Sequence, residues 1–234
     1  MQNLYASFEI AIRLMLELNP LLLEIVGLSL RVSLTAVLLA SICGFFVGAA
    51  LALCEFPGRQ VILVILNAFM GLPPVVVGLT VYLLLSRAGP FGHFGLLFTP
   101  AAMIIAQWIL VSPLIAALSR QVIEDLHTEY RDLLRSLGAT RLETLSTLLW
   151  EGRFSLTTVM LAGFGRAVAE VGAVLIVGGN IVHHTRVMTT SIALETAKGN
   201  LSHALALGMI LIFLACLVNA GISMTKTYAE RASG

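Results

Sequence analysis

Long apolar stretches fill this chain, and polar stretches of very different length separate them. A run of about 20 apolar residues is long enough to cross the hydrocarbon of a bilayer as a helix. This chain has five such runs, and all but the fourth, at 154–177, lack charged residues. The pattern predicts an all-α, polytopic membrane protein that forms a single domain over 1–234, with helical crossings near 32–54, 60–86, 101–119, 154–177 and 202–224.

The composition supports a membrane location and excludes a nucleic-acid partner. Hydrophobic residues make up 58% of the chain and charged residues 12%, whereas a soluble domain carries about 25% charged residues. The formal net charge is only +1, and the arginines are scattered rather than gathered on a basic face. Cys43, Cys54 and Cys216 lack metal-ligand spacing and are interpreted as small buried hydrophobic residues.

The first residues repeat apolar side chains at helical spacing. Leu4, Phe8, Ile12 and Met15 would share one face of a helix that ends at Asn19-Pro20. The pattern fits an amphipathic helix on the membrane surface or a plain packing helix, and both alternatives remain open.

Two small-scale features stand out within the first two crossings. Gly44 and Gly48 form a small-xxx-small pair that would allow close approach of another helix, although such pairs also arise by chance. Pro73 and Pro74 remove two backbone donors and predict a break in the second crossing, whose freed carbonyls must face protein or a cavity. The break is either part of a translocation pathway or a structural kink.

The distribution of Lys and Arg predicts the orientation, since cytoplasmic loops are enriched in them. The bias places the N-terminus outside and both the C-terminal tail and the 120–153 loop in the cytoplasm. The cytoplasmic segments then hold Arg59, Arg120, Arg131, Arg135, Arg141, Arg153, Lys226 and Arg231, and the opposite side holds Arg13, Arg31, Arg87, Arg186 and Lys198.

The 120–153 loop is the only long polar stretch, and its pattern predicts two short amphipathic helices that meet at Gly138. A short helix that presents Leu133, Leu134 and Leu137 could dock on a partner protein. Gly138 would allow a sharp turn that residues with a Cβ make less easily.

The segment from Asp132 to Gly138, DLLRSLG, resembles the cytoplasmic signature of importer permeases: an acidic residue, two small residues, three variable ones and a glycine. It departs from that signature by having Asp132 in place of glutamate and Trp150-Glu151 where Leu-Pro often closes the loop. GLPPVVVG at 71–78 and FGRAVAEVGAV at 164–174 are similar to segments of molybdate-type permeases. The stretch 177–200 looks more like the tungstate-type permeases.

The chain therefore resembles the permease subunit of a bacterial tungstate or molybdate ABC importer of the type I fold. The resemblance implies an oxyanion cargo, tungstate before molybdate or sulfate, and a location in the cytoplasmic (inner) membrane. It also implies a permease homodimer, two copies of a separate ABC ATPase and an extracytoplasmic oxyanion-binding protein. The ATPase-coupling residues would be Asp132, Leu133, Leu134, Leu137 and Gly138. No G-x-x-x-x-G-K-[ST] phosphate loop is present, so we expect no enzymatic activity and no cofactor in this chain.

Arg166 and Glu170 are the charged residues inside a predicted crossing, where a lone charge costs at least about 2.5–3.5 kcal/mol. Their i, i+4 spacing puts them on one helix face. They would either line the pathway of a doubly charged anion together with Pro73 and Pro74, or form an ion pair that fixes helix packing between subunits.

Several polar residues near the fifth crossing have ordinary explanations. His183, His184 and His203 have no nearby ligand cluster, so no metal site is predicted. The His pair would instead lie in an outward-facing loop that a binding protein touches. Thr189 and Thr190, with Ser191, would hydrogen-bond an anion or cap a helix that ends near Gly199.

Two other classes of protein are weighed against the importer. An ion-coupled secondary anion transporter would also place charges at mid-membrane, but it usually shows inverted repeats, and no convincing repeat is visible. An intramembrane enzyme would need an acid/base or nucleophile constellation, for which the pair of Arg166 and Glu170 is a poor candidate.

Overall fold

The computed structural model describes residues 9, 10, 12, 13 and 20–233. The predicted amphipathic helix that ends at Asn19 lies largely outside these residues. Within the described part of the chain, the secondary structure is helical, without strands. The helices are α2 (Pro20–Leu53), α3 (Arg59–Met70), α4 (Pro74–Leu85), the 3₁₀ turn η1 (Gly92–Phe94), α5 (Pro100–Ser136), α6 (Arg141–Glu151), α7 (Arg153–Val168), α8 (Gly172–Gly178), α9 (Met188–Ala197) and α10 (Leu201–Ser233).

The predicted crossings correspond to single helices and to bent helix pairs. Among the described residues, α2, α5 and the first part of α10 are long and apolar enough to span a membrane. The pairs α3/α4 and α7/α8 bend by 101° and 59° at short breaks, and they bring the number of spans to five if each pair is one span. The all-α, multi-pass prediction is therefore confirmed.

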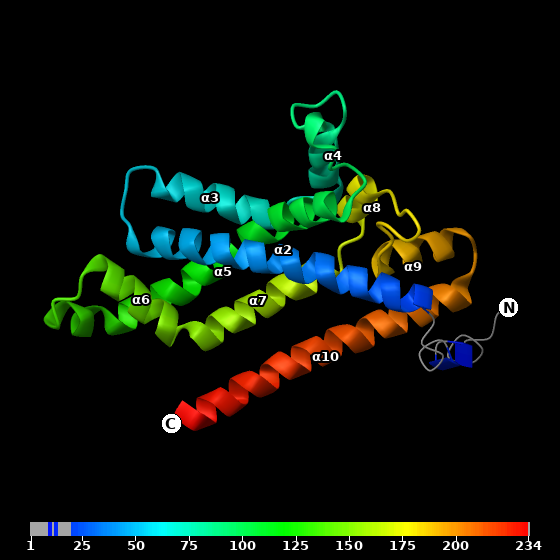
Figure 1. Cartoon of the computed structure of the whole chain (residues 1–234). Helices are drawn as coiled ribbons and strands as arrows, with labels where there is room; N and C mark the ends of the chain where they lie inside the picture. Colours follow the sequence, from blue (N-terminus) through cyan, green and yellow to red (C-terminus); the bar gives the residue numbers. More distant parts are fainter. Residues whose placement is uncertain (1–8, 11, 14–19, 234) are drawn as a thin grey trace.

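Helices α2 and α5 lie side by side and form the centre of the molecule (Figure 1). A Cβ on Gly44 would lie 2.7 Å from Ile115 Cγ2, and a Cβ on Gly48 would lie 2.7 Å from the carbonyl oxygen of Ala116. Only glycine leaves room for α5 at this distance. The close helix contact predicted from the glycine pair is confirmed.

Helix α5 is longer than its predicted crossing. It continues through Arg120 to Ser136, so the prediction of a separate short helix before Gly138 is wrong. Good helix formers follow Arg120, and no Gly or Pro interrupts them, so the helix has no reason to stop where the membrane does. Pro113 also lies inside α5, where the Ser112 hydroxyl donates a hydrogen bond of 2.6 Å to the Trp108 carbonyl in the adjacent turn.

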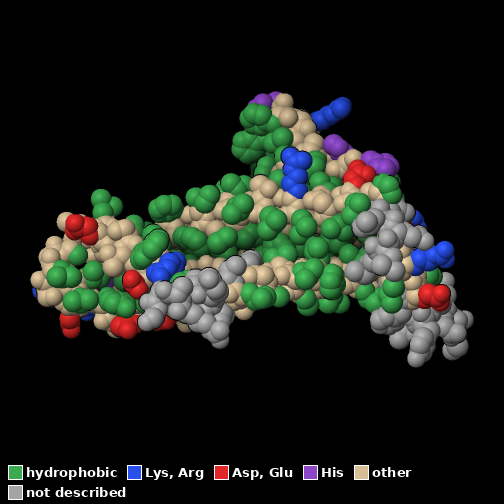
Figure 2. Space-filling model, turned by 60° about the horizontal axis from the view of Figure 1, so that its bottom comes forward, with side chains coloured by type: hydrophobic (Ala, Val, Ile, Leu, Met, Phe, Trp, Pro, Cys, Tyr) green, Lys and Arg blue, Asp and Glu red, His purple; other side chains and the backbone are tan. Residues whose placement is uncertain are grey.

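Polar side chains gather at the two ends of the molecule. Figure 1 shows α6 and the C-terminus toward one end, and α9 and the beginning of α2 toward the other. In Figure 2, hydrophobic side chains cover the middle of the visible face and charged side chains lie mainly at both ends. This distribution is what a bilayer around the middle of the molecule requires.

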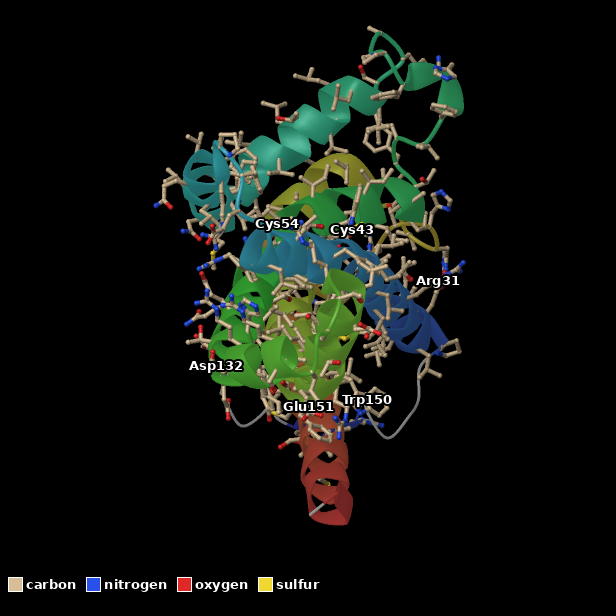
Figure 3. The ribbon with its side chains drawn as sticks, turned by 90° about the vertical axis from the view of Figure 1, so that its left-hand side faces the viewer. Arg31, Cys43, Cys54, Asp132, Trp150 and Glu151 are labelled. Atoms are coloured by element: carbon tan, nitrogen blue, oxygen red, sulfur yellow. The ribbon has the colours of Figure 1, made fainter. Side chains whose placement is uncertain are left out.

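Much of the apolar side-chain surface is exposed. All of α3 is described, and none of its side chains is buried, while α4 stands at a steep angle to the long helices (Figure 1). Cys43 and Cys216 are exposed on apolar helix faces, so their interpretation as buried residues is wrong, and Cys54 is partly buried. Figure 3 labels Cys43 and Cys54, which both belong to the part of the chain that includes α2. These faces are suited to contact with lipid or with another protein chain.

Candidate functional site

The fourth crossing breaks between α7 and α8 without a proline. Helix α7 ends at Val168 and α8 begins at Gly172 after a bend of 59°. Polar side chains from two other helices bond carbonyls at the break. Gln107 Nε2 of α5 donates to the Ala167 carbonyl at 3.0 Å, and Thr189 Oγ1 of α9 donates to the Glu170 carbonyl at 2.9 Å.

Arg166 and Glu170 bridge the two halves of this broken helix. Arg166 Nη1 lies 2.8 Å from Glu170 Oε2, and Glu170 Oε1 accepts the Ala173 N–H at 3.1 Å. The cation sits in the last turn of α7 and the carboxylate caps the first turn of α8, so each charge opposes the dipole of the helix end beside it. The predicted pairing of these two residues with each other is confirmed, and a role of the pair in packing between subunits stays a prediction.

The two members of the pair differ in accessibility. The Glu170 side chain is 4% exposed, whereas the Arg166 side chain is 35% exposed. Glu170 is therefore held by its partners inside the protein, while part of the Arg166 side chain remains accessible. Whether Arg166 contacts a transported anion stays a prediction.

The proline break of the second crossing adjoins the break of the fourth. Pro73 is the N-cap of α4 and Pro74 its first residue, and α3 and α4 meet at 101°. A Cβ on Gly78 of α4 would lie 2.7 Å from Ala173 Cα of α8. A Cβ on Gly172 would lie 3.1 Å from Val75 Cγ2. The first turns of α4 and α8 thus pack together, and the four predicted pathway residues lie on the two adjoining breaks.

A small polar cavity lies beside the break of α7/α8. Its volume is about 10 Å³, and its lining includes Ser29, Ser33, Gln107, Glu170 and Thr189. A cavity of this size holds about one water molecule, and an oxyanion with four oxygens needs several times that room. Within the described residues, this cavity is therefore too small to admit such an anion.

Three of the residues that the sequence analysis placed in or beside an outward-facing loop make hydrogen bonds within the chain. His183 Nδ1 lies 2.7 Å from Glu24 Oε2 at the beginning of α2. The Thr190 hydroxyl accepts the Val187 N–H at 3.1 Å, and the Thr189 hydroxyl donates to the Glu170 carbonyl at the α7/α8 break. Thr190 therefore caps α9, as the capping alternative predicts, whereas Thr189 bonds the α7/α8 break, which neither alternative predicted.

At the opposite end, α5 and α6 form a hairpin around Gly138, whose φ of 68° is left-handed. Thr140 and Glu143 form a capping box at the start of α6: the Glu143 carboxylate accepts the Thr140 N–H at 2.7 Å, and the Glu143 N–H donates to Thr140 Oγ1. The Thr140 backbone N–H, and then its hydroxyl, lower the pKa of Glu143 below its ordinary value of 4.5. The sequence signal for this cap was T-x-x-E, which the sequence analysis missed.

The three leucines of the predicted docking face do not share one environment. Leu133 and Leu137 are 54% and 72% exposed, whereas Leu134 is 8% exposed and packs with Ala49 and Leu148. The prediction that Leu134 is presented to a partner is wrong, because Leu133 and Leu137 lie one turn apart while Leu134 points about 100° away. In Figure 3, which views the molecule from this end, Asp132 lies toward one side and Trp150 and Glu151 toward another.

Exposed apolar residues that the sequence analysis missed extend this end of the molecule. Leu142 on α6 is exposed, and so is Trp150, beside which the Arg153 guanidinium lies 4.8 Å from the ring centroid. We call Leu133, Leu137 and Leu142 the hairpin leucines. Their exposure at a polar end of the molecule marks a surface suited to another protein.

Comparison with known proteins decides the family. Residues 34–225 match the family described as binding-protein-dependent transport system inner membrane component. The chain belongs to this family. The resemblance drawn from the sequence is confirmed, and this permease is accordingly a multi-pass component of an ABC importer whose other parts include an ATPase and a binding protein.

Several curated relatives resemble this permease over most of their length. It is 37% identical to the tungstate uptake system permease protein TupB of Peptoclostridium acidaminophilum, over 95% of this chain and 97% of the relative. It is 42% identical to TupB of Campylobacter jejuni, over 70% of this chain and 69% of the relative. A probable anion ABC transporter permease of Haloferax volcanii is 42% identical over 85% of this chain and 88% of the relative.

More distant matches agree with the fold. The sulfate transport system permease protein CysT of Salmonella typhimurium is 25% identical over 89% of this chain and 78% of the relative. A solved structure, described as the crystal structure of an amino acid ABC transporter with histidines, superposes with a TM-score of 0.63 at 16% identity. That similarity covers 93% of this chain and 96% of the other and shows that the permease has the fold of an ABC transporter chain.

Proposed function

We propose that this permease imports tungstate, with molybdate and sulfate as poorer substrates. The observation that carries the proposal is the identity of 37% and 42% to two tungstate uptake permeases, against 25% to a sulfate permease. In this proposal a binding protein delivers the anion from outside, and the permease works as a homodimer with two ATPase subunits.

The pathway proposed for the anion runs between two protomers. The cavity of about 10 Å³ beside the α7/α8 break is too small for the anion, whereas the exposed part of Arg166 faces outward from its own chain. Arg166 would supply positive potential, and its bond to Glu170 would keep the guanidinium from trapping a dianion. The proline break at Pro73-Pro74 would shape the same route from α4.

The ATPase is proposed to bind at the hairpin, through Asp132 and the hairpin leucines, with Gly138 setting the turn and Leu134 supporting it from inside. Leu137→Asp should weaken ATPase binding about tenfold or more, because it places a charge where the bound ATPase would cover an exposed leucine. Ser136→Asp is the matched control, since it adds the same charge at the neighbouring exposed position and keeps the leucine. Equal ATPase binding by both variants would contradict the coupling assignment.

The proposed orientation places the N-terminus and the His183 loop outside and the hairpin and C-terminus in the cytoplasm. Single cysteines at His183 and at Leu142, in a background without native cysteines, report on it directly. A membrane-impermeant maleimide added to intact cells should label the first position and not the second. The reverse result would overturn the orientation.

Transport by the complete system tests the substrate. Proteoliposomes that contain the permease, the ATPase and the cognate binding protein should take up tungstate only with ATP, and excess molybdate should compete better than excess sulfate. The permease alone, under an ion gradient, should take up none. Tungstate uptake by the permease alone would establish an ion-coupled carrier instead, and a preference for sulfate would refute the substrate assignment.

A further inference from the structure

A cluster of three charged side chains joins α2, α3 and α5 near the hairpin end of the molecule. Arg59 Nη2 lies 3.1 Å from Glu124 Oε1, and Arg120 Nη1 pairs with the other carboxylate oxygen, Oε2. Arg59 also donates from Nε to the Leu51 carbonyl at 2.7 Å, in the last turn of α2. We call Arg59, Arg120 and Glu124 the Glu124 cluster.

Local sequence places Arg59 where it can make both contacts. The turn after α2 ends at Gly58, whose φ of 91° is left-handed, and Arg59 is the first residue of α3. Its side chain reaches back to a free carbonyl at the C-terminal end of α2, where a cation is favoured. One side chain therefore ties the end of α2, the start of α3 and the middle of α5 together.

The cluster is only partly shielded from solvent. The side chains of Arg59, Arg120 and Glu124 are 25%, 23% and 42% exposed. Ion pairs with this exposure add little to folding stability. The cluster instead fixes the position of α3 relative to α5. A hydrogen-bonded guanidinium holds its partner in one geometry, whereas apolar contacts are non-directional and allow two helices to slide.

Helix α3 depends on this fixed point more than the other helices do. None of its side chains is buried, and it contacts the rest of the chain mainly along α5. Beyond Gly71 it leads into α4, whose first turn packs against α8 immediately after Glu170. A movement of α3 along α5 would therefore move the two adjoining helix breaks.

Helix α5 connects the same cluster to the hairpin without interruption. It is one continuous helix from Pro100 to Ser136, so Glu124 and Asp132 belong to the same rigid element, about 12 Å apart at the usual helical rise. A displacement of the hairpin that carries α5 with it displaces Glu124 by a comparable amount. Arg59 then carries that displacement to α3.

We propose that Glu124 is the positioning residue that passes movement of the α5/α6 hairpin to α3, and through α4 to the breaks that hold Arg166 and Glu170. Glu124 touches neither the transported anion nor the ATPase; it acts through Arg59. The inference rests on the proposed function, in which the hairpin receives the movement of the ATPase.

The test compares Glu124→Gln with Asp125→Asn in the complete transporter. Asp125 is the neighbouring exposed carboxylate on α5, and among the described residues it forms no hydrogen bond or ion pair through its side chain, so it controls for loss of charge. Glu124→Gln should bind the ATPase and hydrolyse ATP, but tungstate uptake per ATP hydrolysed should fall at least fivefold. Asp125→Asn should match the wild type. Arg59→Gln should reproduce the loss, and the double variant should be no worse than either single variant.

A structural readout separates this inference from the proposed function. Spin labels at Val64 on α3 and Leu217 on α10 should change their separation when ATP is added to the complete transporter, and Glu124→Gln should abolish the change. Unchanged coupling and an unchanged label response in Glu124→Gln would overturn the inference, as would loss of ATPase binding in that variant, which would make the cluster a support for the hairpin fold. If Leu137→Asp retains the ATPase, or the wild type takes up no tungstate, the proposed function fails while the label response still reports on Glu124.

Discussion

One methyl group, added at either of two glycines of α2, should change stability in opposite directions. Gly48 faces α5, where an added Cβ would lie 2.7 Å from the Ala116 carbonyl oxygen, 2.8 Å from the Arg120 nitrogen and 3.0 Å from Ser119 Cβ. Gly27 lies on the same helix with nothing within 4 Å of the added atom. Both residues are helical and not left-handed, so the backbone tolerates alanine at each position.

The magnitudes follow from these distances. Ordinary contacts begin at 3.4 Å, so Gly48→Ala forces α2 and α5 apart by several tenths of an ångström, because the two nearest opposing atoms belong to the backbone and cannot rotate away. Overpacking of this kind costs about 1–3 kcal/mol. Gly27→Ala meets no neighbour and should gain about 0.5–1 kcal/mol from the reduced conformational freedom of the unfolded chain.

The assay is unfolding of the purified permease by sodium dodecyl sulfate in mixed micelles, followed by far-ultraviolet circular dichroism. Gly48→Ala should unfold at a lower detergent fraction than the wild type, and Gly27→Ala at the same or a higher one. Because the same atoms are added to the same helix, helix propensity cancels between the two variants. Equal midpoints, or a stabilised Gly48→Ala, would refute the close packing of α2 on the α5 backbone.

Three further predictions concern the break and the hairpin. Arg166→Gln should lower tungstate uptake at least tenfold while the ATPase remains bound, and normal uptake by correctly assembled transporter would restrict the pair with Glu170 to a structural role. Thr189→Val leaves the Glu170 carbonyl without its donor and should lower the free energy of unfolding by about 1–3 kcal/mol, which the same detergent titration measures. The folded pKa of Glu143 is lowered, so its capping contribution is complete above its ordinary value of 4.5 and is lost as the pH falls through the lower folded value. Thr140→Ala removes the hydroxyl but keeps the backbone N–H, so it should raise that pKa part of the way toward 4.5 in a carboxyl NMR titration, and an unchanged pKa would contradict the hydroxyl's part in the capping box.

The sequence predicted those features that depend on local pattern. Long apolar runs located the spans, Gly44 and Gly48 located a close helix contact, and Gly138 located the hairpin turn. Each of these is decided within a few residues, by the length of a hydrophobic run or by the absence of a Cβ. Their prediction therefore needed no knowledge of the neighbouring helices.

The ends of helices were predicted less well, because the edge of a bilayer is not the end of a helix. Arg120 was interpreted as the start of a loop, yet α5 keeps its backbone hydrogen bonds on both sides of that residue. The spacing of Leu133 and Leu137, one turn apart, could have distinguished them from Leu134. Only the packing partners Ala49 and Leu148 show which of the two faces is buried.

The break between α7 and α8 could not have been predicted from its own residues. No proline marks it, and the groups that satisfy its carbonyls are Gln107 and Thr189, which lie on other helices. The meeting of this break with the one at Pro73-Pro74 depends likewise on Gly78 and Gly172, whose roles appear only when α4 and α8 are packed. Tertiary contacts, rather than local propensity, fix the site.

The unbroken course of α5 sets a rule for how this protein can vary. Each residue of an α-helix advances its azimuth by about 100°, so deleting one residue between Glu124 and Asp132 would rotate Leu137 by that angle relative to Arg59 and everything bound to it. Amino-acid substitutions along this stretch should be tolerated, whereas a change in the number of residues should not. Insertions and deletions should therefore be absent from this stretch in functional homologues, even where its amino acids differ at most positions.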